Sequence, residues 1–111
     1  MEMKIHLDSD IFGIIKTGTK DIEVRLNDEK RKKLKVGDTL IFFKRPLDDE
    51  SVTKKVKKLE YYNSFEELVK HYEMKRIYLD GCSEQKYLEL MERFYSKEEQ
   101  DKYGVVAIIF E

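Results

Sequence analysis

The chain contains a single cysteine, Cys82, so no disulfide can form within it. Proteins of oxidising compartments usually carry paired cysteines, and this sequence has no such framework. Residues 1–10 lack the apolar core of a signal peptide, and no run approaches the ~20 apolar residues of a membrane span. We therefore expect a cytoplasmic protein without a membrane partner, in which Cys82 is a structural thiol rather than a nucleophile.

Metal-binding side chains are also scarce. The two histidines, His6 and His71, stand far apart in the sequence, and one cysteine cannot complete a zinc-binding pair. Zinc sites need three or four such ligands at characteristic spacings. The sequence therefore predicts no metal site, and we expect no cofactor.

Neither sign of charge dominates, because 22 lysines and arginines nearly balance 23 aspartates and glutamates. A whole-molecule field that attracts a polyanion is therefore excluded. The charges are unevenly divided: residues 1–58 carry fifteen basic and eleven acidic side chains, whereas residues 59–111 carry seven and twelve. This division is compatible with an electropositive face on the amino-terminal half, although a barrel could equally scatter those charges.

The apolar residues suffice for one core. Hydrophobic residues make up 41% of the 111 residues, and six phenylalanines and seven tyrosines are among the largest. Chains near this length bury one core rather than two, and no repeat, low-complexity segment or linker divides the sequence. We expect one domain over residues 1–111, as a monomer or weak homodimer.

Alternation of apolar and polar residues predicts five strands. The third has a near-continuous apolar run, which predicts burial on both faces, and the last is uniformly apolar, which predicts a central position. A strand at each end of the chain often means that the terminal strands pair to close a barrel or curled sheet. The predicted strands are Met3–Leu7, Lys20–Leu26, Thr39–Phe43, Val52–Tyr62 and Val105–Phe110.

Helices are predicted between these strands, giving an α+β order. Serines followed by acidic residues indicate N-caps at Ser64, Ser83 and Ser96. The stripe of Tyr87, Leu88, Met91 and Phe94 or Tyr95 is typical of the buried side of a helix. The predicted helices are one ending at Gly18, a short basic turn over residues 28–33, Phe65–Glu73, one after Ser83, and a brief one from Ser96 to Tyr103.

Three strong charges, Lys20, Glu23 and Arg25, lie close together in the second strand. Strand alternation places Glu23 and Arg25 on one face and the intervening aliphatic residues in the core. Two cations beside a carboxylate are a plausible site for a phosphorylated or polar planar ligand. A solvated strand face with an ion pair explains the pattern equally, since exposed pairs contribute only ~0–1 kcal/mol and need no function.

The segment Gly18–Arg25, followed by the Val36-Gly37-Asp38 turn into an apolar strand, resembles the signature of the activating signal cointegrator homology (ASCH) family. Gly18, Lys20, Glu23 and Arg25 match its Gly-x-Lys-x-x-Glu-x-Arg pattern, and segments from Tyr62 and from Gly104 resemble later parts of the family. The resemblance implies a PUA-like β-barrel, an α+β fold with a curled mixed sheet of about five or six strands, short helices at its edge and a charged cleft.

The resemblance also implies a function connected with RNA or modified nucleosides. Some ASCH proteins are ribonucleases, and one small bacterial branch is an amidohydrolase that deacetylates N4-acetylcytidine. In that branch the residue three after the signature lysine is a nucleophilic threonine, whereas here it is Glu23, and Thr17 and Thr19 are out of register. A carboxylate cannot form the same acyl-enzyme, so we expect no threonine-type deacetylation.

Three functions remain open from the sequence. The first is binding of RNA or a nucleotide-like ligand, with or without ribonuclease-type hydrolysis. The second is an amidohydrolase acting on an acylated nucleoside, and the third is a non-catalytic interaction module in translation or its regulation. The predicted catalytic residues are Lys20, Glu23 and Arg25. The predicted ligand-binding residues are Lys20, Arg25, Tyr62, Tyr103, Lys33 and Lys55.

Overall fold

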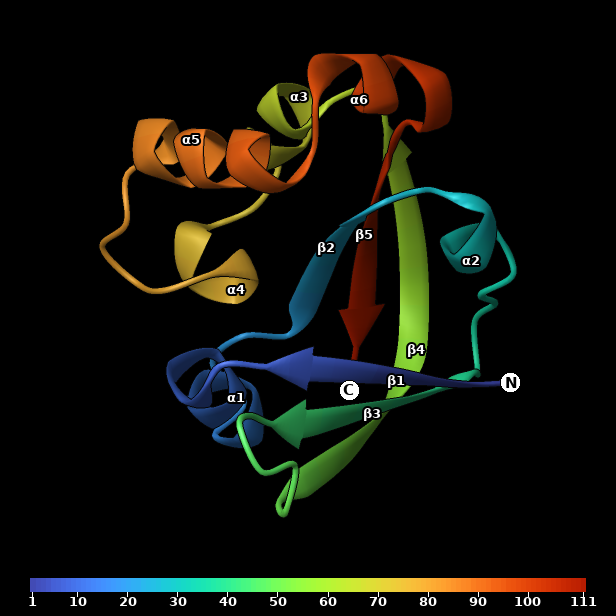
Figure 1. Cartoon of the computed structure of the whole chain (residues 1–111), viewed down its shortest axis with the longest axis vertical. Coiled ribbons are helices and arrows are strands. Elements are labelled where there is room, and N and C mark those ends of the chain that lie inside the picture. The colour runs from blue at the N-terminus through green and yellow to red at the C-terminus, as the bar shows by residue number, and fades with distance from the viewer.

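The computed structural model describes residues Met1 to Glu111. Five strands form one curled mixed sheet in the order β1-β3-β4-β5-β2, in which only the β1–β3 pair is parallel. Figure 1 shows that β1 and β3 run across the direction of β5. Strand β4 pairs with β3 and then with β5, so it belongs to both groups of strands. The strands are β1 (Glu2–Leu7), β2 (Ile22–Leu26), β3 (Thr39–Lys44), β4 (Ser51–Tyr62) and β5 (Val105–Phe110).

The long strand β4 curls the sheet. Its first part pairs with β3 as far as Lys55, and from Val56 onward it pairs with β5. The register shifts between Val56 and Lys58, and such irregularities bend a strand and increase its twist. One strand therefore serves two differently oriented halves of the sheet.

The terminal strands do not pair with each other, so the prediction that they close the barrel is wrong. Strand β1 pairs only with β3, whereas β5 lies between β4 and β2. The two edge strands are consequently β1 and β2, and the curled sheet is a half-barrel that stays open between them.

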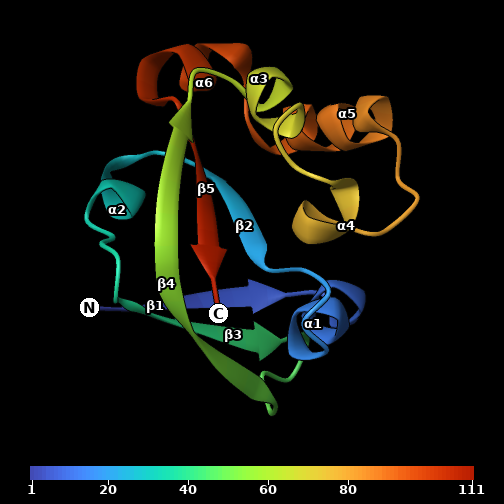
Figure 2. The same cartoon turned by 180° about the vertical axis from the view of Figure 1, so that it is seen from behind.

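Six short helices lie around the sheet: α1 (Ser9–Lys16), α2 (Glu29–Lys32), α3 (Phe65–Val69), α4 (Met74–Ile77), α5 (Glu84–Phe94) and α6 (Lys97–Tyr103). Figure 2 shows α3, α5 and α6 gathered at one end of the molecule, with α1 beside the ends of β1 and β3. The three predicted serine caps are confirmed, because each side chain accepts a backbone N–H of the following turn. None of the helices combines the length and the apolar character needed to cross a bilayer.

The continuous helix predicted over residues 65–73 is wrong, because α3 ends at Val69 and α4 begins only at Met74. Two tertiary contacts hold the intervening residues. The Tyr72 hydroxyl lies 2.8 Å from that of Tyr62, and the His71 ring lies 4.9 Å from the Tyr62 ring. These contacts with β4 favour a bent connection over the helical continuation that local propensity predicts.

Strand β5 separates two hydrophobic cores, which confirms its predicted central position. All six of its residues are buried. Val105, Ala107 and Ile109 face the helices, and Val106, Ile108 and Phe110 face β1, β3 and α1. The side-chain alternation of a strand places successive residues on opposite faces, so one apolar strand supplies both cores.

The prediction that β3 is buried on both faces is wrong. Leu40 and Phe42 are fully buried, but Ile41 and Phe43 between them are only partly buried. The buried pair points toward the core that contains Phe110, and the alternate residues point away from it. Phe43 stacks on His6 at 5.2 Å between ring centroids, outside that core.

Replacement of glycine by alanine is expected to have opposite effects on stability at Gly104 and at Gly13. Gly104 has φ 71° and ψ −176°, a region essentially restricted to glycine, and an added Cβ would lie 3.1 Å from the Tyr62 carbonyl oxygen. We expect Gly104→Ala to lower the free energy of unfolding by about 1–3 kcal/mol. Gly13 lies inside α1 with no atom near such a Cβ, so Gly13→Ala should raise it by about 0.5–1 kcal/mol. Urea denaturation measures both, and equal effects would contradict this interpretation of Gly104.

Candidate ligand-binding site

The structure brings together the three residues predicted as a charged cluster. The Lys20 Nζ lies 3.0 Å from Glu23 Oε1, and the Arg25 Nη2 and Nε lie 2.7 and 2.9 Å from Glu23 Oε2. Glu23 thus bridges two cations with its two oxygens. Lys20 and Glu23 are only 3% and 5% exposed, so this charged cluster is buried and is not the solvated strand face that the sequence left open.

Lys20 also joins separate parts of the backbone. Its ammonium donates to the Ile22 carbonyl at 2.6 Å and to the Ile77 carbonyl at 2.8 Å, in addition to Glu23. An ammonium has three N–H groups, so these three acceptors use all of them. Lys20 therefore connects the start of β2 to the end of α4 and has no donor left for a ligand.

The electrostatics of the charged cluster follow from burial and from its two cations. Burial opposes ionisation of the Glu23 carboxyl, but the charges of Lys20 and Arg25 outweigh it and lower the Glu23 pKa to about 2. Burial lowers the pKa of Lys20, and the charge of Glu23 partly offsets this. The charge of Glu23 raises the pKa of Arg25. Glu23 is consequently ionised at neutral pH and is a weak base.

A cavity of about 400 Å³ lies beside the charged cluster, and we call it the cleft. It is lined by both edge strands of the open half-barrel, and Lys20, Glu23 and Arg25 are all among its residues. The Arg25 side chain is 24% exposed, against 3% and 6% for the side chains of Lys20 and Glu23. Arg25 is therefore the member of the charged cluster that a ligand would meet.

Other parts of the chain complete the cleft. Helices α4 and α5 and the residues that follow them contribute a largely apolar and aromatic wall. The opposite side carries several charged or titratable side chains. The aromatic residues are Tyr78, Tyr87, Phe94 and Tyr95, and the charged or titratable residues of the other side are His6, Asp8, Asp10 and Arg45.

The aromatic wall was missed by sequence reasoning. The stripe on α5 was predicted to be buried, and this is confirmed for Tyr87 and Met91. It is wrong for Phe94, which is 67% exposed. Helical periodicity shows which residues share a face, but it cannot show where that face leaves the core and borders a cleft.

The remaining predicted ligand-binding residues do not line the cleft; they are Tyr62, Tyr103, Lys33 and Lys55. Tyr62 packs edge-on against Tyr72, and their hydroxyl oxygens lie 2.8 Å apart. Tyr103 lies near the ammonium groups of two lysines of α2 and α6. Lys33 caps α2, and Lys55 donates to Thr39 Oγ1 at 2.7 Å. These four residues are thus spread over other surfaces.

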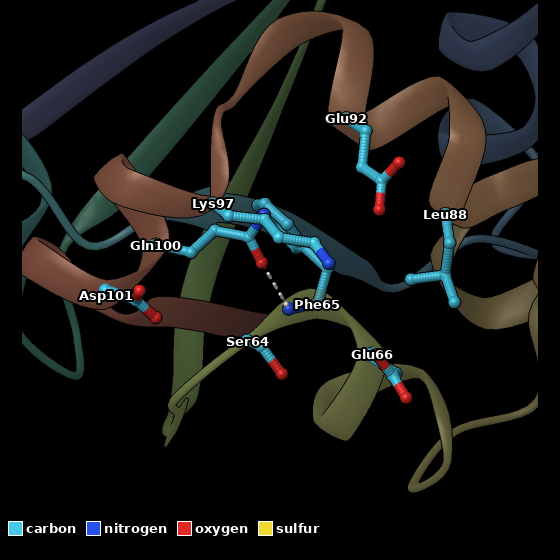
Figure 3. A pocket seen from close by; sticks show the side chains of 8 residues that line it. All are labelled: Ser64, Phe65, Glu66, Leu88, Glu92, Lys97, Gln100 and Asp101. Carbon is cyan, nitrogen blue, oxygen red and sulfur yellow. Dashed lines mark hydrogen bonds between the residues drawn. The ribbon is translucent and has the colours of Figure 1, made fainter.

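A second hollow, of about 210 Å³, lies between α3, α5 and α6 (Figure 3). Figure 3 shows Gln100 in this hollow, where its side-chain oxygen accepts the Phe65 backbone N–H at 3.1 Å. Gln100 is the one buried polar residue besides Lys20 and Glu23. Its hydrogen bond joins α6 to the start of α3, which explains why this polar side chain is buried. The two buried charged residues, Lys20 and Glu23, both line the cleft instead.

The curled five-stranded half-barrel with short helices at its edge is a PUA-like fold. The ASCH domain model matches residues 5–111, so the chain belongs to the ASCH domain family. This confirms the resemblance carried by Gly18, Lys20, Glu23 and Arg25.

Solved structures agree with this assignment. The crystal structure of the hypothetical protein PH0355 matches with a TM-score of 0.86 at 34% identity, covering 100% of this chain and 98% of that chain. Protein PF0455 from Pyrococcus furiosus matches with a TM-score of 0.79, also at 34% identity, over 100% of this chain and 96% of that chain. ASCH from Zymomonas mobilis, at 18% identity and a TM-score of 0.66, covers 99% of this chain and 66% of that chain and shares the fold. No curated protein matches the chain.

Proposed function

We propose that this ASCH domain binds an RNA segment or a nucleotide-like ligand in the cleft, with Arg25 as the principal polar contact. The observation that carries the proposal is the geometry of Arg25. Glu23 holds its Nε and Nη2 atoms, while the side chain remains partly exposed to the cleft. A guanidinium has five N–H donors in a rigid plane, so donors remain for a phosphate or for the acceptor edge of a base.

The aromatic wall supports a ligand with a planar base. Stacking of bases on aromatic rings contributes about 1–3 kcal/mol per base and tolerates any base. Phe94 is exposed at the cleft, and Tyr78 and Tyr87 lie deeper with ring centroids 5.7 Å apart. The cleft volume of about 400 Å³ lies within the range of about 300–1,000 Å³ that is common for small-ligand sites.

The polar groups of the cleft favour binding over acyl-enzyme chemistry. Both oxygens of Glu23 are engaged, and its pKa of about 2 makes it a poor general base. No serine, threonine or cysteine lines the cleft, so no aliphatic hydroxyl or thiol is placed there to form an acyl-enzyme. These observations weigh against the amidohydrolase alternative. They support Lys20 and Glu23 as residues that position Arg25.

A longer RNA would extend beyond the cleft. Lys33 and Lys55 are exposed and are proposed to contact its phosphates, since such contacts need only accessible cations. Tyr62 and Tyr103 are partly exposed and are proposed as secondary stacking positions outside the cleft. In this arrangement the cleft holds one nucleotide, and the outer residues add affinity for its neighbours.

Isothermal titration with a nucleoside, its monophosphate and a short single-stranded RNA tests the proposal. We expect Arg25→Gln to weaken binding of the monophosphate by about 10- to 100-fold, because hydrogen bonds to a charged group are worth about 1.5–3 kcal/mol. Arg93→Gln is the matched control, since Arg93 is exposed on α5 and does not line the cleft. Equal losses in the two variants, or no binding of any of the three probes to the natural protein, would refute the proposal and favour a non-catalytic interaction module.

A further inference from the structure

Strand β2, which borders the cleft, has an open edge. It pairs only with β5 (Figure 1). The Phe110 N–H donates to the Asp21 carbonyl, and alternate residues of an antiparallel pair exchange such bonds. By the register of the two strands, Glu23 and Arg25 therefore direct their backbone N–H and C=O groups to β5. The residues of β2 whose backbone groups point the other way, toward the open edge, are Ile22, Val24 and Leu26.

These three residues differ in what meets their outward backbone groups. The Ile22 carbonyl accepts a hydrogen bond from the Lys20 ammonium at 2.6 Å, and Leu26 does not line the cleft. Val24 lines the cleft and is only 6% exposed, but no loop and no second strand bonds to its N–H or its C=O. Buried backbone groups are almost always paired, so one donor and one acceptor of Val24 remain for a ligand.

A donor and an acceptor side by side in one plane match the edge of a nucleobase. On an edge strand they normally exchange two hydrogen bonds with one residue of a further strand. The Watson–Crick edge of a base offers the same complement, since uracil presents N3–H beside O4 and adenine presents N6–H beside N1. A peptide strand fits less well, because strand addition uses alternate residues along an edge, and of the outward residues of β2 only Val24 lines the cleft.

The rest of the cleft agrees with a base at this position. No asparagine or glutamine lines the cleft, so no side-chain amide competes with the backbone of Val24 for a donor–acceptor edge. The Val24 side chain packs in the core that contains Tyr87, and the Arg25 side chain lies on the opposite face of β2. A ring that continues the sheet at Val24 therefore has one face toward the aromatic wall and the other toward the side of Arg25.

We propose that the backbone N–H and C=O of Val24 bind the Watson–Crick edge of the base in the cleft, so that the ligand is an unpaired nucleotide. This inference rests on the proposed function, because it requires a nucleotide whose phosphate contacts Arg25. Each of the four RNA bases presents an adjacent donor and acceptor on this edge, so the cleft accepts all four. A base that is paired with a second strand, or whose Watson–Crick edge carries a methyl group, is rejected.

Isothermal titration with pairs of modified nucleotides tests which edge of the base is bound. Uridine monophosphate methylated at N3 has lost the donor of the Watson–Crick edge, whereas the 5-methyl compound keeps that edge. We expect the N3-methyl group to weaken binding by about 10- to 100-fold and the 5-methyl group by less than about twofold, because only the first leaves the buried Val24 carbonyl unpaired. For adenosine monophosphate, dimethylation of N6 should weaken binding by a similar factor, and replacement of N7 by carbon should not.

Amide NMR spectra of the 15N-labelled protein locate the contact. With uridine monophosphate, adenosine monophosphate or a single-stranded RNA, we expect the Val24 amide proton to move downfield, because it gains a hydrogen bond. The Leu26 amide is the internal control, since it points outward on the same edge but lies outside the cleft, and its signal should stay in place. The single-stranded RNA should also bind at least about tenfold more tightly than the same strand annealed to its complement.

The outcomes separate this inference from the proposed function. Equal affinity for the two methylated uridine nucleotides, equal affinity for single-stranded and annealed RNA, or an unchanged Val24 amide in the complex would overturn this inference and leave the proposed function intact. A shift of the Val24 amide with an extended peptide of alternating threonine and valine, but with no nucleotide or RNA, would assign the edge to a peptide partner and overturn both. Failure of every nucleotide and RNA to bind would also overturn both.

Discussion

Replacement of Lys20 by methionine is expected to lower the free energy of unfolding by about 3–5 kcal/mol, the usual cost of removing one partner from a buried ion pair. Methionine has a similar length but no donors. The substitution leaves Glu23 with one cation and leaves the carbonyl groups of Ile22 and Ile77 without the Lys20 ammonium. Because these carbonyls belong to β2 and α4, the connection between the half-barrel and its helices is weakened together with the charged cluster.

Chemical denaturation of Lys20→Met and Lys58→Met measures this effect. Lys58 lies on β4 with a side chain that is 64% exposed and 3.6 Å from Glu60, so its replacement should change stability by no more than about 0.5 kcal/mol. A loss below about 1 kcal/mol for Lys20→Met would mean that its ammonium does not hold the backbone as described.

Acid is expected to destabilise the protein through Glu23. The folded-state pKa of Glu23 is about 2, below the ordinary glutamate value of 4.5. A depressed folded pKa contributes stability that is complete above the unfolded value and is lost as the pH falls through the folded value. We therefore expect a loss of about 3 kcal/mol attributable to this group between about pH 5 and pH 2.

Glu23→Gln tests the assignment of that loss. The variant should be less stable at pH 7, because glutamine cannot pair with two cations, and its stability should depend less on pH in the acid range. Glu92→Gln, an exposed substitution on α5, should retain the natural pH dependence. Parallel stability curves for the natural protein and Glu23→Gln would assign the acid sensitivity to other carboxylates, such as Asp38 and Glu50, whose pKa values are also lowered by neighbouring cations.

Local sequence patterns were sufficient to predict the positions of the strands, the serine N-caps and the proximity of Lys20, Glu23 and Arg25. Alternation and capping depend on residues that are neighbours in sequence, and the charged cluster lies within one turn and one strand. Those patterns could not predict the pairing of β1 with β3 instead of β5, because strand pairing depends on the whole sheet. For the same reason they could not show that the barrel remains open beside the charged cluster.

The parts of the cleft that sequence reasoning missed come from separate segments. Phe94 belongs to a helix face whose earlier residues are buried, so helical spacing alone predicts burial for it as well. His6 lines the cleft because β1 pairs with β3 and forms one edge of the open half-barrel. No motif or spacing in the sequence connects His6 with Arg25 on the other edge strand.

The buried charges of Lys20 and Glu23 have two consequences for the structure. Lys20 and Glu23 stabilise the junction of β2 and α4, and the same contacts hold the Arg25 guanidinium at the cleft. A buried ion pair is by itself weak evidence of stabilisation. The proposed ligand would therefore contact the N–H donors of Arg25 that Glu23 leaves free.

A crystal structure of the protein soaked with nucleoside monophosphates tests the central claim most directly. We expect the phosphate or the base edge to lie about 3 Å from the Arg25 guanidinium, with the base against Phe94 and with Lys20 still bonded to Ile22 and Ile77. A ligand bound on another surface while the cleft is filled by solvent, or a cleft that binds none of the panel, would contradict it.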